Sequence, residues 1–150
     1  MLNKFKKQMK NEKGLTLIEL LAVVVILAII AAIAIPAIGN IIKNSQVGAL
    51  KSDTLNAISA AELYLLDNPT ATTIKLDDID GTATNATGDP YLDDKGGLTA
   101  FEFTVSGKKI SSTAKKGNIT LTAVGATKQQ IINFANNTKT GGTGPVSVTR

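Results

Sequence analysis

The sequence predicts an α+β fold in which one long N-terminal helix packs on a small antiparallel sheet. Three observations lead to this expectation. An uncharged, mostly apolar run extends from Leu20 to Ile42. Apolar residues then recur at spacings of three and four, the period of a helix with one buried face. Further along the chain, apolar and polar residues alternate, which is the period of a half-buried strand.

The N-terminal leader carries the net charge of the chain. Residues 1–14 contain five lysines and one glutamate and end in Gly14. From Leu15 onward the chain has eleven basic and eleven acidic residues, so the formal net charge of +4 comes from the leader. The high isoelectric point is therefore no evidence for nucleic-acid binding. By the positive-inside rule, a basic leader keeps the N-terminus of a following membrane helix in the cytoplasm.

The run from Leu20 to Ile42 meets the length of about 20 residues that a membrane-spanning helix needs. It is longer than the apolar region of a cleaved secretory signal peptide, which has roughly 7–15 residues. A plain signal anchor has the same length and flanks. Length and flanking charge alone therefore do not exclude an anchor that simply stays in the membrane.

An amphipathic helix is expected to continue beyond the apolar run. Its apolar stripe consists of Val47, Leu50, Thr54, Ile58, Ala61 and Leu65. The pattern stops at Asp67-Asn68-Pro69, which terminates helices. The sequence therefore predicts a helix from about Leu15 to Leu66, with residues 15–42 in lipid and residues 43–66 outside it.

Residues 67–150 are predicted to form a globular head that covers this stripe. Residues 67–99 are rich in Thr, Asp, Gly and Asn and are expected to be loop, with a short turn at Leu76–Ile79. Alternation predicts an antiparallel meander of strands around 101–105, 109–113 and 119–123, whose covering side chains would be Phe101, Phe103, Ile119 and Leu121. Residues 127–137 fit a short helix or a fourth strand, and the tail fits a flexible end or an edge strand.

Composition argues against an enzyme. The chain contains no His and no Cys. This excludes Ser-His-Asp and Cys-His nucleophilic catalysis, cysteine-based zinc sites and disulfides. No acid-base pair or nucleophile stands out, and no cofactor or metal is expected.

The junction Lys13-Gly14-Leu15-Thr16-Leu17-Ile18-Glu19 carries the strongest functional signal. A carboxylate inside a membrane segment costs about 2.5–3.5 kcal/mol on insertion scales and is a functional candidate by default. The plainer interpretation is that Glu19 reaches to the membrane surface. Pro36, which lacks an N–H, lies later in the same apolar run, where an interior proline costs about 3 kcal/mol relative to alanine. A simple helix kink is the plainer interpretation there.

The stretch of roughly residues 8–45 closely resembles the cleavage and assembly region of type IV prepilins and pseudopilins. The resemblance rests on the basic leader ending in Gly14, the apolar Leu15, Glu19 at the fifth position after the cut, and Pro36. It implies cleavage between Gly14 and Leu15 by a prepilin peptidase, N-methylation of Leu15, and roles in assembly for Glu19 and Pro36. Leu15 replaces the usual Phe, and the cysteine pair that staples the C-terminal loop of many relatives is missing.

The resemblance also implies an organisation and a function. Residues 1–14 would be a cleaved leader, 15–42 a transmembrane and filament-core helix, 43–66 the amphipathic outer half of that helix, and 67–150 a type IV pilin-like head. The chain would be a structural subunit, held in the cytoplasmic membrane before assembly and in an extracellular pilus afterwards.

Expected partners are further copies of the chain in a helical homopolymer, the prepilin peptidase, and the assembly ATPase and platform protein. DNA or a host surface is a further candidate partner. Nothing in the sequence separates DNA uptake or competence, motility, adhesion and secretion as the purpose of the filament. The alternative is a monomeric, signal-anchored surface protein whose head binds a ligand.

Charge is segregated within the head. Residues 53–102 hold ten acids and two bases, whereas residues 103–150 hold seven bases and no acid. Three interpretations remain open: neutralisation within one head, complementary faces between stacked heads, and a DNA-contacting surface without aromatic stacking partners. The acids of residues 77–94 fit a solvated loop or, with a spacing unlike an EF-hand, a calcium site.

Overall fold

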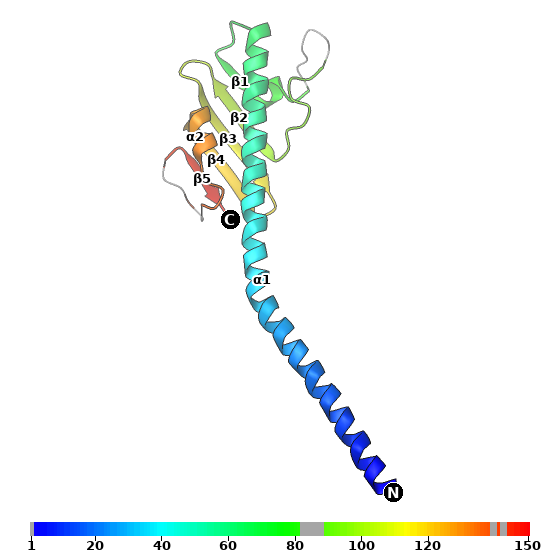
Figure 1. Cartoon of the computed structure of the whole chain (residues 1–150). Coiled ribbons are helices and arrows are strands. Elements are labelled where there is room, and N and C mark those ends of the chain that lie inside the picture. The colour runs from blue at the N-terminus through cyan, green and yellow to red at the C-terminus, as the bar shows by residue number, and fades with distance from the viewer. Residues whose placement is uncertain (1, 82–88, 139–140, 142–143) are drawn as a thin grey trace. The chain divides into compact units, whose positions relative to one another are not determined.

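The computed structural model describes residues 2–81, 89–138, 141 and 144–150, with side chains from Leu17 onward. The chain separates into two compact units, Met1–Ile41 and Ile42–Arg150. The helix α1 (Leu2–Asp67) supplies all of the described part of the first unit and the opening segment of the second (Figure 1). The second unit is the head.

The helix α1 begins earlier than the sequence pattern indicated. It starts at Leu2, so the predicted start near Leu15 is wrong for the uncut chain. The leader contains no proline, and its five Lys, two Met, one Gln and one Glu favour helix. Gly14 costs a helix only about 1 kcal/mol. The helix ends at Asp67, one residue beyond the predicted end. The Asn68 N–H still donates to the Tyr64 carbonyl at 2.9 Å before the chain turns away.

Five strands of the head form one sheet in which neighbours along the chain are neighbours in space and every pair is antiparallel. The strands are β1 (Thr73–Lys75), β2 (Leu98–Thr104), β3 (Lys109–Lys116), β4 (Ile119–Ala126) and β5 (Val146–Thr149). The predicted α+β class and the antiparallel meander are therefore confirmed. Short turns join β2 to β3 and β3 to β4, and such hairpins place sequence neighbours side by side; longer segments, residues 76–97 and 127–145, connect the outer strands β1 and β5.

Part of the segment read as loop, residues 67–99, is regular structure. The strand β1 pairs with β2, with Ile74 opposite Phe103, and was missed because three residues are too few to establish an alternation. The expected turn at Leu76–Ile79 is the 3₁₀ helix η1 (Leu76–Asp78).

The two open choices at the C-terminal end are also decided. A helix, α2 (Lys128–Asn133), forms within 127–137 because a reciprocal cap starts it: the Gln130 N–H donates to the Thr127 hydroxyl, and the Thr127 N–H donates to the Gln130 side chain. The tail supplies β5, an edge strand paired with β4.

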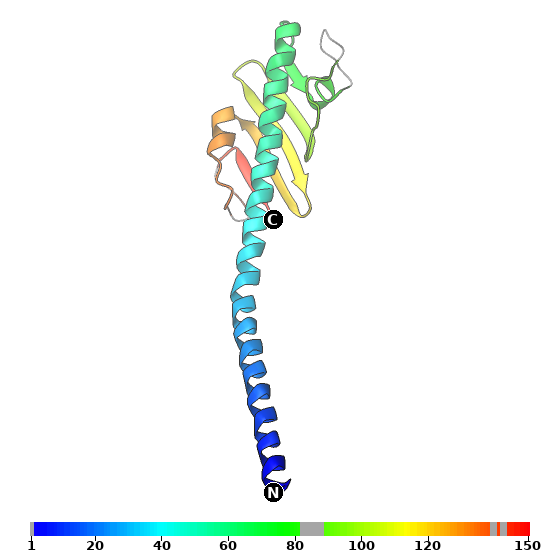
Figure 2. The same cartoon turned by 45° about the vertical axis from the view of Figure 1, so that its right-hand side comes forward.

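The core of the head forms where the outer half of α1 lies across one face of the sheet (Figure 2). The predicted stripe is confirmed: Leu65 is partly buried, and its other five members, from Val47 to Ala61, are no more than 1% exposed. Thr54 is tolerated there because its hydroxyl donates to the Leu50 carbonyl at 2.9 Å. The predicted covering side chains Phe101, Phe103, Ile119 and Leu121 are all buried.

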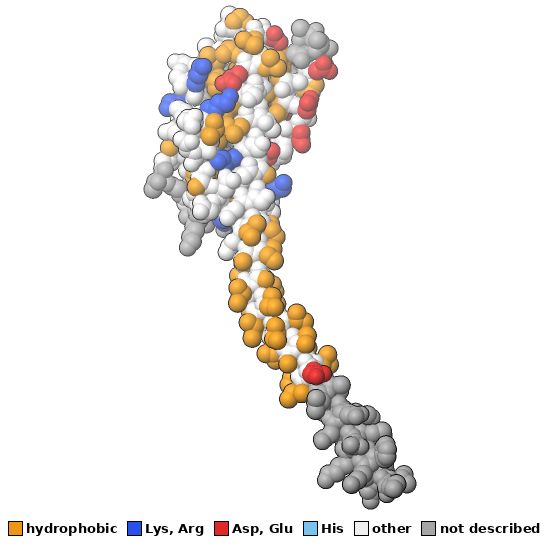
Figure 3. Space-filling view, viewed as in Figure 1, with side chains coloured by type: hydrophobic (Ala, Val, Ile, Leu, Met, Phe, Trp, Pro, Cys, Tyr) orange, Lys and Arg blue, Asp and Glu red, His pale blue; other side chains and the backbone are white. Residues whose placement is uncertain are grey.

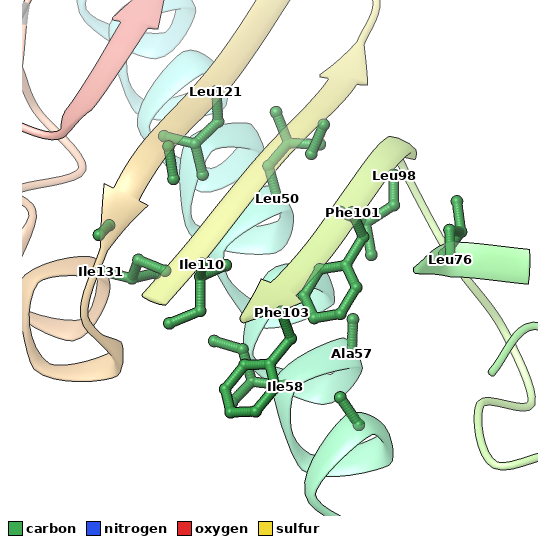
Figure 4. Close-up of a cluster of buried hydrophobic side chains, with 14 of the residues drawn as sticks. Leu50, Ala57, Ile58, Leu76, Leu98, Phe101, Phe103, Ile110, Leu121 and Ile131 are labelled. Carbon is green, nitrogen blue, oxygen red and sulfur yellow. The ribbon is translucent and has the colours of Figure 1, made fainter. Parts of the chain in front are cut away.

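Figure 4 shows the side chains of β2 and β3 directed toward α1 around Ile58. Each fully buried Leu, Ile, Val or Phe contributes about 1.5–3 kcal/mol. The head therefore holds a core of its own without disulfides.

Candidate processing and assembly site

The apolar segment of α1 presents hydrophobic side chains on every side. All large hydrophobic residues from Leu17 to Ile42 are 50–71% exposed in the single chain. In the described part of the chain, one helix, Leu17–Asp67, is long and apolar enough to cross a membrane. A helix that is apolar all round needs lipid or protein around it. Figure 3 shows this continuous hydrophobic surface.

Glu19 interrupts that surface near its start. It is exposed and is the one charged residue between Leu15 and Ile42. In Figure 3 a single acidic side chain stands at this end of the hydrophobic surface. No ion pair joins Glu19 to another described side chain. Among the side chains that the structure describes, the Glu19 carboxylate therefore has no charged partner.

The backbone of Gly14 and Leu15 belongs to α1, and the side chain of Leu15 lies outside the described part of the structure. Residues four apart on a helix lie on the same face. The Leu15 nitrogen and the Glu19 carboxylate are thus on one side of α1. Gly14 has no side chain that could shield the peptide bond to Leu15.

Pro36 lies inside α1 and is exposed. Because proline has no N–H, the Ala32 carbonyl lacks its usual helical donor. Gly39 follows one turn later, and a methyl group added there would meet no atom within 4 Å. Packing within the chain therefore does not require glycine at this position.

Sequence reasoning missed a polar clamp that ties the C-terminal segments to α1. The Lys51 amine donates to the carbonyls of Ile132 at 3.0 Å and Phe134 at 2.7 Å, and burial lowers its pKa. The Arg150 guanidinium donates twice to the Asn44 side chain, at 3.0 Å each time. These partners are 81 to 106 residues apart in the chain, so no local pattern could have revealed them.

A second missed contact holds the loop before β2 against α1. The Gly97 N–H donates to the Asp53 carboxylate at 2.8 Å. A methyl group on Gly96 would lie 2.4 Å from that carboxylate, and one on Gly97 would lie 2.5 Å from Leu50. The adjacent glycines were the one available signal, since paired glycines often mark a close backbone approach.

The end of α1 is fastened to the same loop. The Tyr91 hydroxyl donates to the Asp67 carboxylate at 2.7 Å, and this hydrogen bond raises the pKa of Tyr91 to about 12. The Tyr91 ring meets that of Tyr64 edge to face, with centroids 5.2 Å apart. In the described residues no group of three or more acidic side chains is placed to hold a metal ion.

Comparison with known families gives one match, the prokaryotic N-terminal methylation motif, at residues 9–35. Comparisons with curated proteins and with solved structures gave no match. The matched segment contains the Gly14–Leu15 junction and Glu19 and ends one residue before Pro36. The motif marks prepilins and their relatives, and a long helix packed on a small antiparallel sheet is the fold of type IV pilins. The chain therefore carries the N-terminal motif that marks type IV prepilin-like and pseudopilin-like proteins.

Proposed function

We propose that this protein is the precursor of a filament subunit, cut after Gly14 and polymerised through residues 15–42. The observation that carries the proposal is Glu19, a lone carboxylate in an exposed apolar helix, four residues after a Gly-Leu junction. An intramembrane carboxylate is costly, so its presence needs a partner that forms at some stage of the protein's life.

Processing would create that partner. Before processing, the chain spans the cytoplasmic membrane once with its leader inside. A membrane prepilin peptidase hydrolyses the bond between Gly14 and Leu15, which leaves a carboxylate on Gly14 and an amine on Leu15. The new amine on Leu15 is then N-methylated and stays positive. The cut also removes the lysines that hold this end at the cytoplasmic surface.

Assembly would move the apolar helix from lipid into a filament core. The side chains that are half or more exposed in the single chain pack against neighbouring copies. A charge that leaves water needs a counter-charge, and the Glu19 carboxylate of one copy supplies it for the Leu15 amine of the next. The pair contributes more to register than to stability, because desolvation offsets much of the attraction. Pairing with the Leu15 amine of the same helix, four residues away, competes with this arrangement.

Pro36 would give the core helix a weak point. With the Ala32 carbonyl unpaired, the turn around Pro36 is easier to deform than its neighbours. The segment from Pro36 to Gly39 then adapts to the packing of the filament.

The force for extraction would come from an assembly ATPase acting through a platform protein in the membrane. The head stays outside the cell throughout and covers the filament surface. DNA or a host surface would meet the filament there.

The test is to replace Glu19 and to measure sheared filament against membrane-held protein. Glu19→Val and the isosteric Glu19→Gln should leave insertion and cleavage intact, because neither touches the junction residues Gly14 to Leu17. Both should abolish or sharply reduce filaments, since breaking a buried charge pair costs about 3–5 kcal/mol. Glu19→Asp, which keeps the charge and loses one methylene, should be intermediate. Wild-type filament levels from Glu19→Gln cells would contradict the ion pair.

A second substitution tests the cut itself. Gly14→Val places a branched side chain beside the bond to Leu15 and should leave the leader attached, whereas Gly14→Ala should be partly processed. Intact-mass measurement of the membrane protein tests this directly, because the cut and uncut forms differ in mass by the 14 residues of the leader. A wild-type protein that keeps Met1 and forms no sheared polymer would support the monomeric surface anchor instead.

A further inference from the structure

Two grooves of similar size border α1 on different sides of the head. The first, here the basic groove, has Ile58 and Phe103 in its floor and Lys108 and Lys128 at its rim, with a volume of about 410 Å³. A smaller hollow of about 300 Å³ shares Phe103 and Lys108 with it. The second, the acidic groove, also has a volume of about 410 Å³ and is lined by Ala60, Leu63, Asp93 and Asp94.

The two rims carry opposite charges that remain available. Among the described residues there are two ion pairs, Lys95 with Asp80 at 3.5 Å and Lys128 with Glu62 at 3.0 Å. Lys108 and Asp93 belong to neither pair, and both are exposed. On the face of the head that Figure 3 shows, most acidic side chains lie along one flank and most lysines along the other. Neutralisation inside one head therefore leaves the central charge of each rim unused.

Lys108 holds its position at a cost in backbone energy. It is the one non-glycine residue of the described chain with a positive φ, 48°, in the turn between β2 and β3. Glycine or asparagine is more common in this conformation, and other residues there cost about 1–2 kcal/mol. Lys108, at this strained position, lines both the basic groove and the smaller hollow; Glu62 lines both as well but is paired with Lys128.

Both grooves also expose apolar surface that a partner would cover. Leu63 in the acidic groove is 46% exposed, and Ile132 in the basic groove is 44% exposed. Both grooves thus expose apolar side chains, and their rims carry charges of opposite sign. A surface that complements a different surface of the same molecule makes a head-to-tail contact, which generates an open filament rather than a closed dimer.

We propose that the acidic groove of one head docks on the basic groove of the next copy, with Asp93 beside the neighbour's Lys108. This inference rests on the proposed function, because it names the contact between heads in that filament. The apolar floors supply contact area, and the rim charges orient the heads and exclude the reversed pairing.

Cross-linking of intact filaments tests the contact, and the absence of native cysteine makes each introduced thiol unique. The double variant Asp93→Cys/Lys108→Cys, treated with a short bis-maleimide, should give a ladder of multimers on a denaturing gel. Each single variant should stay monomeric. The matched control is Asp93→Cys/Lys116→Cys, because Lys116 is an exposed lysine at the opposite end of β3. No ladder from the first pair, or an equal ladder from the control, overturns the docking.

Charge reversal provides the second measurement. Lys108→Glu should lower sheared filament roughly fivefold, in proportion to a rim ion pair replaced by repulsion. Adding Asp93→Lys to the same chain should restore the yield, and Lys116→Glu should leave it unchanged. The loss should lessen at high salt, where exposed charges are screened.

The outcomes distinguish a failure of the proposed docking from a failure of the proposed filament function. Normal filaments from wild-type cells without the ladder and without the charge rescue would overturn the docking and leave the filament assignment standing. If Lys108→Glu instead leaves filament yield unchanged and weakens retardation of duplex DNA, the basic groove serves nucleic acid and the docking is wrong. Absence of any wild-type filament would overturn both.

Discussion

Substitution of Gly97 by alanine tests how closely the loop before β2 approaches α1. The new methyl group would lie 2.5 Å from a Leu50 methyl and 2.7 Å from the Lys115 carbonyl oxygen. Neither neighbour has room to move, because Leu50 is fully buried and the Lys115 carbonyl belongs to the backbone of β3. The φ of Gly97 is not in the left-handed region, so the effect is steric alone.

The magnitude follows from two opposing terms. Overpacking of a filled core costs about 1–3 kcal/mol. Alanine also restricts the unfolded chain relative to glycine, which returns about 0.4–1 kcal/mol. The distances below 3 Å to two immobile groups place the cost at the upper end of its range, so we expect a net loss of about 2 kcal/mol. For a head of this size that corresponds to a fall of about 8 °C in Tm.

The assay is thermal unfolding of the full chain in detergent, followed by near-ultraviolet circular dichroism of the tyrosines in the head. The matched control is Gly48→Ala, inside α1. There the new methyl group lies 3.0 Å from the end of the Asn136 side chain, which can turn away, and alanine improves helix propensity by about 1 kcal/mol. Its Tm should stay the same or rise. A Gly97→Ala Tm within about 2 °C of wild type would refute the close approach.

Two further predictions concern the core and the end of α1. Phe103→Ala should lower the free energy of unfolding by about 3–5 kcal/mol because the ring is buried between β2 and α1, and an unchanged urea midpoint would place that ring in solvent. The hydrogen bond to Asp67 raises the pKa of Tyr91 to about 12, so its stabilising contribution is complete below a pH of about 10 and is lost as the pH rises through about 12. An absorbance titration of tyrosinate should show a late step for Tyr91 that Tyr91→Phe removes, while a Tyr91 step near 10 would contradict the hydrogen bond.

Much of the fold could be predicted because its patterns are local and periodic. The spacing from Val47 to Leu65 identified the buried face of α1, and the alternation at Phe101 and Phe103 identified the buried face of β2. A run of several residues with one period outweighs the ambiguity of any single residue. The strand β1 escaped because three residues do not establish a period.

The candidate site was visible in the sequence for a different reason. Gly14, Leu15 and Glu19 lie within one short segment, and Pro36 follows on the same helix, so their relation depends on chain order rather than on folding. Their roles in cleavage and assembly remain predictions. The start of α1 at Leu2 was not predicted, because the expected helix began at the cleavage junction. The helix-forming residues of the leader extend α1 toward the N-terminus, and cleavage would remove that extension.

By itself, the sequence determined the apolar helix, its lone carboxylate and the meander of the head, because each is encoded in residues close together along the chain. Only the tertiary structure decided which distant groups meet. It brought Lys51 to the carbonyls of Ile132 and Phe134, and Asp53 to Gly97. It also sorted the segregated charges onto two different grooves beside α1. Such contacts join residues many positions apart, and their geometry follows from packing of the whole core rather than from any periodic pattern.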